Sequence, residues 1–136
     1  MDVYLSEEAS LLLKALSLAS SRPRADGFLI GHKRGQRFFV EKIFSSERGF
    51  FPSLENFRGL DQLFDGKIIG FFSFKADKKK IKKILAAFAY GKLFLDVHLN
   101  KRHKMAIRSY VVDFRNTFYL SPVIFRLCKS NITKKG

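Results

Sequence analysis

The sequence predicts a single α/β domain of the α+β type, with a mixed sheet flanked by helices. Its length of 136 residues is that of one domain. Hydrophobic residues make up 46% of the chain and aromatic residues 15%, which is enough for a core and too much for a disordered chain. Apolar runs typical of strands alternate with two helical patterns. The predicted element order is α-β-β-loop-β-α-β-β.

The first helix is predicted over residues 6–20. Ser6 is a suitable N-cap, and Glu7 and Glu8 lie in the first turn, where negative charge is favourable. Apolar residues at helical spacing are predicted to face the core: Leu5, Ala9, Leu12, Leu13, Leu16 and Ala19.

A hairpin is predicted next, with strands over residues 26–31 and 37–45. Between them lies a basic turn, 32–36, which contains a glycine. Residues 46–64 are predicted to be an irregular loop that folds back onto the core. Gly49, Pro52 and Gly59 interrupt any regular period there.

Residues 66–74 form a continuous apolar run, which is typical of a central strand buried on both faces. A second helix is predicted over residues 77–90, with Asp77 as N-cap and Gly91 as C-cap. Its apolar face is predicted from residues at helical spacing: Ile81, Ile84, Leu85 and Phe88.

The C-terminal part is predicted to add strands over residues 92–99 and 105–113, joined by a basic turn. Residues 116–125 are predicted to be a further strand or a short terminal element. The domain is expected to span residues 1–128, followed by a flexible basic tail over 129–136.

The expected location is the cytoplasm. Cys128 has no second cysteine to pair with, as is usual for a reducing compartment. The N-terminus lacks a signal-peptide pattern, and no apolar run approaches the roughly 20 residues that span a bilayer.

Charge is strongly asymmetric along the chain, whose net charge is +14. Residues 1–70 contain ten Lys or Arg and nine Asp or Glu, whereas residues 71–136 contain sixteen and three. This asymmetry favours an anionic partner, either an acidic protein or nucleic acid, although a solvated lysine-rich surface is the alternative. The predicted contacts are Lys75, Lys78, Lys79, Lys80, Lys82, Lys83, Lys101, Arg102 and Lys104.

The kind of anionic partner is constrained by neighbouring residues. Lysine outweighs arginine in the 75–83 cluster, which favours contact with a nucleic-acid backbone over base reading. Exposed aromatic rings beside the lysines would favour single strands. The nearby rings are predicted to be core: Phe71, Phe72, Phe74 and Tyr90. The 77–90 helix could lie on a membrane surface, but its apolar face also suits packing on a sheet.

No catalytic, cofactor or metal site is predicted from the motifs. The spacing of His32, His98 and His103 is no recognised ligand pattern. Ser73 has no predicted base nearby, and the glycine-framed 31–35 segment lacks the Gly-Lys-Ser/Thr ending of a phosphate-binding loop.

Three segments nevertheless resemble the JAB/MPN domain, the fold of the JAMM metalloproteases. They are Asp26-Gly-Phe-Leu-Ile-Gly31 with the following Phe39-Val-Glu41 strand, Ile68-Ile-Gly-Phe-Phe-Ser-Phe74, and the strand pair from Lys92 to Val112. The resemblance covers roughly residues 6–113 and implies the fold of that family.

The family's enzymes hold zinc with a His-x-His-Pro turn and an Asp about ten residues on, and a Glu before the first glycine strand activates water. In the matching register this chain has Arg24 for the Glu, Ser73 and Lys75 for the histidines, and Ala86 for the Asp. A slip of one residue gives Phe72, Phe74 and Leu85.

The resemblance therefore implies a degenerate member, a pseudoenzyme without metal that acts as a binding or scaffold module. Members of the family pair with another copy or with a relative, so the resemblance is compatible with a homodimer. Two alternatives remain open: a hydrolase with an unrecognised site or a metal shared with a partner chain, and a nucleic-acid-binding protein of another α/β fold.

Overall fold

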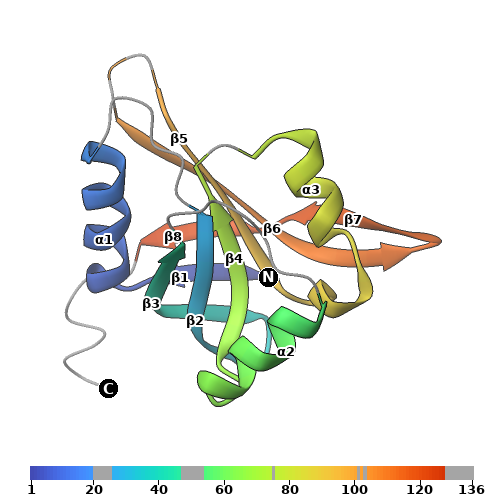
Figure 1. Ribbon diagram of the computed structural model, residues 1–136. Helices are drawn as coiled ribbons and strands as arrows, with labels where there is room; N and C mark the ends of the chain where they lie inside the picture. Colours follow the sequence, from blue (N-terminus) through green and yellow to red (C-terminus); the bar gives the residue numbers. More distant parts are fainter. Residues whose placement is uncertain (20–25, 47–53, 75, 101, 103, 128–136) are drawn as a thin grey trace.

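The computed structural model describes residues 1–19, 26–46, 54–74, 76–100, 102 and 104–127. Cys128 and the predicted tail lie outside them. The described strands are β1 (Asp2–Leu5), β2 (Asp26–Arg34), β3 (Arg37–Ser46), β4 (Ile68–Ser73), β5 (Leu93–Leu99), β6 (Met105–Arg115), β7 (Thr117–Pro122) and β8 (Ile124–Leu127). The described helices are α1 (Glu7–Leu18), α2 (Leu54–Leu63), α3 (Lys78–Ile84) and the 3-10 turn η1 (Ala87–Ala89) (Figure 1).

The strands form one mixed sheet in the order β7-β6-β5-β4-β2-β3-β1-β8. β4 and β5 pair in parallel, as β1 does with β3 and β8, and the other pairs are antiparallel. The two outer strands are consecutive in the chain, separated by Val123, whose N–H donates to the Ser109 carbonyl at 3.0 Å. The sheet therefore curls until it is nearly barrel-shaped, and the predicted mixed sheet with helices is confirmed.

The predicted hairpin is present as β2 and β3, with a tighter turn than expected. Strand β2 continues to Arg34, so the turn consists of Gly35, with φ at +56°, and Gln36. Gly27 and Gly31 have a different role, because a Cβ at either position would collide with a carbonyl of β3. The glycine-apolar-glycine pattern is thus explained by close strand contact.

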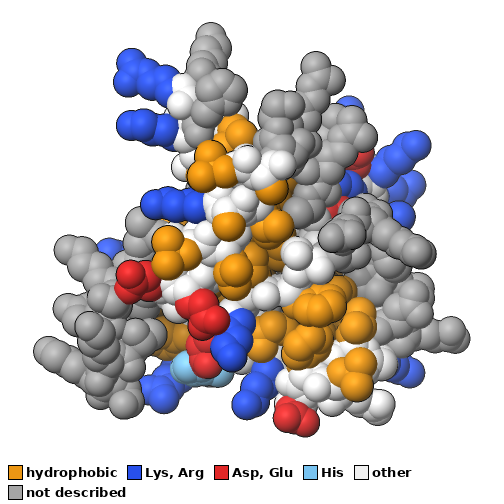
Figure 2. Space-filling view, turned by 60° about the vertical axis from the view of Figure 1, so that its left-hand side comes forward, with side chains coloured by type: hydrophobic (Ala, Val, Ile, Leu, Met, Phe, Trp, Pro, Cys, Tyr) orange, Lys and Arg blue, Asp and Glu red, His pale blue; other side chains and the backbone are white. Residues whose placement is uncertain are grey.

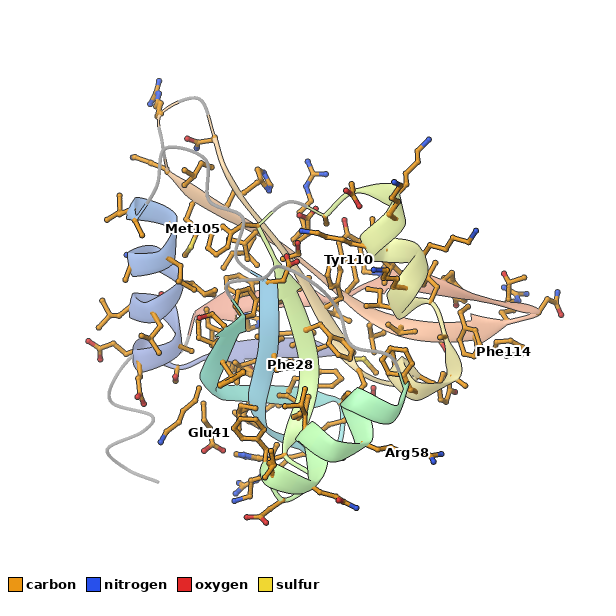
Figure 3. All side chains as sticks on the ribbon, viewed as in Figure 1. Phe28, Glu41, Arg58, Met105, Tyr110 and Phe114 are labelled. Atoms are coloured by element: carbon orange, nitrogen blue, oxygen red, sulfur yellow. The ribbon has the colours of Figure 1, made fainter. Side chains whose placement is uncertain are left out.

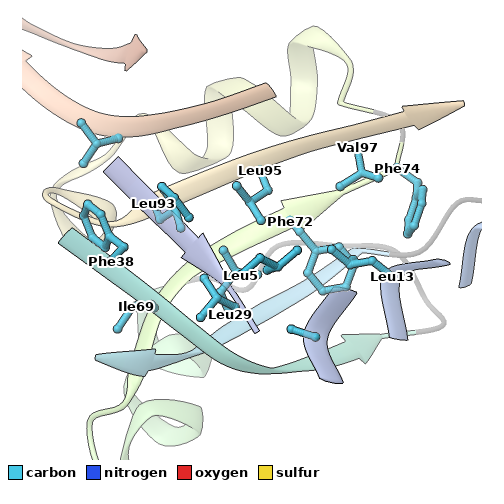
Figure 4. Packing of buried hydrophobic residues seen from close by; sticks show 14 residues of the cluster. Leu5, Leu13, Leu29, Phe38, Ile69, Phe72, Phe74, Leu93, Leu95 and Val97 are labelled. Atoms are coloured by element: carbon cyan, nitrogen blue, oxygen red, sulfur yellow. The ribbon is translucent and has the colours of Figure 1, made fainter. Parts of the chain in front are cut away.

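Hydrophobic side chains are buried on both sides of the sheet. One cluster lies between the sheet and α1 (Figure 4), and it includes Val3, Leu5, Leu13, Leu29, Phe38, Phe72, Leu93 and Leu95. The other is rich in phenylalanine, draws on α2, α3 and η1, and includes Phe28, Phe57, Ile68, Phe71, Ile84 and Phe94. All six residues of β4 are buried, which confirms the predicted central strand.

Two elements differ from the prediction. Strand β1 was not expected, and it pairs with β3 and β8, which are distant in sequence. The segment predicted as a loop contains α2, which buries Phe57 and partly buries Leu60, and Phe64 directly after the helix is also partly buried. Gly59 does not break this helix. It lies on the exposed side, where a Cβ would meet no other atom within 4 Å.

The helices α1 and α3 also need correction in detail. In α1 the N-cap Ser6 is confirmed, but Leu12 and Ala19 are exposed, so the buried side is narrower than expected. Helix α3 ends at Ile84 because the chain turns into the separate η1 turn. Gly91 follows that turn with φ at +75°, so it does not cap α3.

Candidate functional site

The end of β4 places Ser73 directly opposite Asp26, the first residue of β2. Ala86, another position of the expected vacated site, is extended between α3 and η1. Arg24 and Lys75 lie outside the described residues. The structure brings Ser73 together with two residues that sequence reasoning did not connect with it, Asp26 and Lys80.

These three side chains form the Asp26 cluster. The Ser73 hydroxyl donates to Asp26 Oδ1 at 2.5 Å, and Lys80 Nζ lies 3.0 Å from Oδ1 and 2.9 Å from Oδ2. Lys80 Nζ is also 3.5 Å from Ser73 Oγ. The Asp26 and Ser73 side chains are fully buried, and 19% of the Lys80 side chain is exposed. The cluster is an internal ion pair with a hydroxyl bonded to it.

Local structure explains why Lys80 turns inward. Asp77 caps α3 by accepting a hydrogen bond from the Lys80 backbone N–H at 2.9 Å, which fixes the first turn beside the end of β4. Lys80 and the buried Ile84 are four residues apart, so both lie on the side of α3 that faces the sheet. The prediction that Lys80 contacts a partner is therefore corrected, because its ammonium group is held by Asp26.

The chemistry of the cluster is that of charge neutralisation. A buried carboxylate is stable only when it is paired and hydrogen-bonded, and Lys80 and Ser73 supply both interactions. A nucleophilic serine must reach its substrate, whereas Ser73 has no exposed surface.

No group of three or more His, Cys, Asp and Glu able to hold a metal occurs among the described residues. His32 Nδ1 lies 2.6 Å from Glu41 Oε1, and the ring stacks on Phe39. His98 belongs to β5, which is separated from β2 by β4. His103 lies outside the described residues.

The outer surface of α3 carries four exposed lysines, Lys78, Lys79, Lys82 and Lys83, which we call the α3 lysines. No acidic residue lies within the helix itself. Asp77, which precedes the helix, is exposed, and its pKa is lowered chiefly by the hydrogen bond from the Lys80 backbone N–H.

The second predicted basic group lies at the β5–β6 turn. Arg102 and Lys104 are exposed, and their backbone N–H groups donate to Asn100 Oδ1 at 2.9 and 3.0 Å. Lys101 lies outside the described residues. In Figure 1 the β5–β6 hairpin extends toward the side of α1, whereas α3 lies beside the β6–β7 hairpin.

The aromatic rings near α3 divide into two kinds. Phe71, Phe72 and Phe74 are buried, as predicted. Tyr90, which was also predicted to be core, is 57% exposed, and Phe114 is 51% exposed. Sequence reasoning missed Phe114. The signal was its place in an alternating strand directly before a tight turn.

No helix in the described part of the chain is long and apolar enough to cross a membrane.

Comparison with known proteins defines the class of fold. No family model and no curated protein sequence matches the chain significantly. Among solved structures, the fold is similar to the solution structure of protein DSY2949 from Desulfitobacterium hafniense, with a TM-score of 0.63 and 14% sequence identity. The match covers 95% of this chain and 96% of that one. At this identity the similarity concerns the fold alone: a single-domain α+β protein with a mixed, nearly closed sheet.

Proposed function

We propose that this chain is a non-catalytic binding or scaffold module of the JAB/MPN type, and that the α3 lysines dock an anionic partner. The observation that carries the proposal is the Asp26 cluster. The resemblance places the first metal-binding histidine of the family at Ser73. Here that position is bonded to a buried carboxylate, which is neutralised by Lys80.

The docking surface is supported by the way α3 divides its lysines. Lys80 is paired with the buried Asp26, and the α3 lysines remain exposed. They form two like-charge pairs at i, i+4 spacing, Lys78 with Lys82 and Lys79 with Lys83, each of which costs about 0.2–0.5 kcal/mol. An anionic partner would remove this repulsion, so the surface favours binding of negative charge.

The test replaces all four α3 lysines with Gln and measures retention on heparin together with the salt dependence of binding. We expect weaker retention and a flatter dependence on salt, since fewer counterions are displaced. The matched control changes four exposed basic residues elsewhere and removes the same charge: Lys33, Arg34, Lys42 and Lys67. Equal losses in both variants would contradict a dedicated surface on α3.

The non-catalytic part of the proposal is tested by metal content. Zinc is measured in the purified protein after loading with excess zinc and gel filtration. We expect far less than one equivalent of zinc, because Lys80 already neutralises the Asp26 carboxylate that is hydrogen-bonded to Ser73. One tightly bound equivalent would contradict the proposal and favour the hydrolase alternative.

Self-association through α1 is part of the same proposal. The helix exposes an apolar stripe at i, i+4, i+7 spacing, formed by Leu11 (58% exposed), Ala15 and Leu18 (77% exposed). Figure 2, in which the side that carries α1 comes forward, shows hydrophobic side chains at the surface there. Glu8 and Lys14 are exposed three residues before and after Leu11. An antiparallel pair of α1 helices about Leu11 would therefore join Glu8 of one copy to Lys14 of the other.

The molar mass in solution, from gel filtration with light scattering, tests this pairing. We expect twice the 15.7 kDa of the chain. A monomer at micromolar concentration would contradict it.

A further inference from the structure

Three aromatic side chains extend from the phenylalanine-rich cluster to the surface, and we call them the aromatic ledge: Tyr90, Phe114 and Phe118. Phe118 is partly buried and packs against the cluster. Its ring centroid is 4.9 Å from that of Phe114 and 6.5 Å from that of Tyr90. The interplanar angles are 59° and 62°. Phe118 thus supports the other two rings, and about half of the surface of each remains open to solvent.

The ledge lies on the same side of the sheet as α3. Phe118 packs against the cluster that contains Ile84, the buried residue of α3. Figure 1 shows α3 beside the β6–β7 hairpin, and Figure 3 shows Phe114 toward the tip of that hairpin. Exposed rings and the α3 lysines therefore belong to one side of the molecule.

The acidic residue next to the ledge is turned away from it. Side chains alternate along a strand, so Asp113 lies on the opposite face of β6 from Phe114. Its carboxylate accepts a hydrogen bond from the Tyr119 hydroxyl at 3.3 Å, and Tyr119 lies on that same opposite face. The Asp113 carboxylate thus faces away from the surface formed by the rings and the lysines.

We propose that this surface binds single-stranded nucleic acid, with bases stacked on Tyr90 and Phe114 and phosphates held by the α3 lysines. The inference rests on the docking surface proposed above and names its partner. Base–aromatic stacking needs an accessible ring face and tolerates any base, whereas a duplex hides the faces of its bases. Lysine is a point charge suited to a phosphate chain. Single-stranded nucleic acid alternates bases with phosphates. Such a polymer fits a surface of separate rings and lysines better than a folded acidic protein does.

The test measures the affinity of fluorescein-labelled 15-mers of dT and rU by fluorescence anisotropy, for the wild type and for the double variant Tyr90→Ala, Phe114→Ala. We expect each lost ring to weaken binding about 10-fold. Heparin has no bases, so its retention should be unchanged. Both side chains are more than half exposed, so the variant should keep its thermal midpoint, which circular dichroism checks.

Two controls isolate stacking from other effects. Tyr119→Ala removes an exposed ring from the opposite face of the same hairpin and should leave the affinity unchanged. Phe114→Trp keeps an aromatic face and should retain the affinity of the wild type.

The outcomes separate this inference from the docking proposal. If the aromatic variant binds oligonucleotides like the wild type while the lysine variant does not, the ledge has no role and the docking surface stands. A wild type that binds duplex DNA as tightly as single strands, or binds polyglutamate but no oligonucleotide, overturns the inference in the same way. If the lysine variant also keeps its heparin retention, both proposals fail.

Discussion

Helices α1 and α3 both pack one side on the sheet, yet they present opposite surfaces to solvent. α1 buries Leu13 and exposes Leu11 and Leu18, so its outer side carries an apolar stripe. α3 buries Ile84, and its outer side carries four lysines. An exposed apolar stripe flanked by charged residues is typical of a contact with another protein. The surface of α3 instead favours an anion.

In both helices, residue type alone does not decide whether a side chain lies in the interior or at the surface. Lys80 lies among the α3 lysines in sequence, but its ammonium group is part of the interior because Asp26 is there. Leu18 belongs to the same helix as Leu13, but its side chain is 77% exposed. In both helices the neighbouring strand decides which side chains serve the fold.

The largest effect on stability is expected from Asp26→Ala. Without its partner, the ammonium group of Lys80 would be left uncompensated in a mostly buried place, which costs about 3–5 kcal/mol. The free energy of unfolding in urea measures this loss. Lys82→Ala, on the outer side of the same helix, should change it by less than about 0.5 kcal/mol. Equal effects of the two substitutions would show that Lys80 is not part of the interior.

A smaller effect is expected in α1 from Leu13→Ala, which leaves a cavity under the helix and costs about 3 kcal/mol. Leu18→Ala should stay within about 0.5 kcal/mol, because this side chain is exposed. Leu18→Lys should keep the stability and reduce the molar mass of a dimer to that of a monomer. If Leu18→Ala were as destabilising as Leu13→Ala, the apolar stripe would belong to the fold and not to an interface.

The smallest effect concerns the cap of α3. The pKa of Asp77 is lowered from its ordinary 3.8, chiefly by the hydrogen bond from the Lys80 backbone N–H. The folded protein therefore prefers the charged carboxylate, and the stability that this charge supplies is present above pH 3.8 and lost as the pH falls through the folded pKa. Comparison of urea unfolding for the wild type and Asp77→Asn between pH 2 and 6 tests this. The advantage of the wild type should shrink with falling pH, and a constant difference would contradict it.

Much of the fold was predictable because its signals are local. The apolar run that became β4 and the glycine-framed hairpin were recognised from adjacent residues, and both caps, Ser6 and Asp77, were placed correctly. Strand β1 was missed because four residues carry little periodicity and its partners lie far along the chain. Helix α2 was missed because an exposed Gly59 looked like a break.

The candidate site was predictable only in part. The sequence located Ser73 and the lysines of α3, but it did not connect Ser73 with Asp26, 47 residues earlier, or Asp26 with Lys80, 54 residues later. It assigned Tyr90 to the core, and the structure exposes it.

The sequence by itself determined the size of the domain, its mixed α and β content, the central strand and the concentration of positive charge in its second half. These follow from composition and from periodicity over a few residues, which each segment carries alone. Only the tertiary structure decided which lysine is buried, which leucines and rings are exposed, and which acid neutralises which base. Those properties depend on pairing between distant segments, and the pairing exists only when the sheet closes.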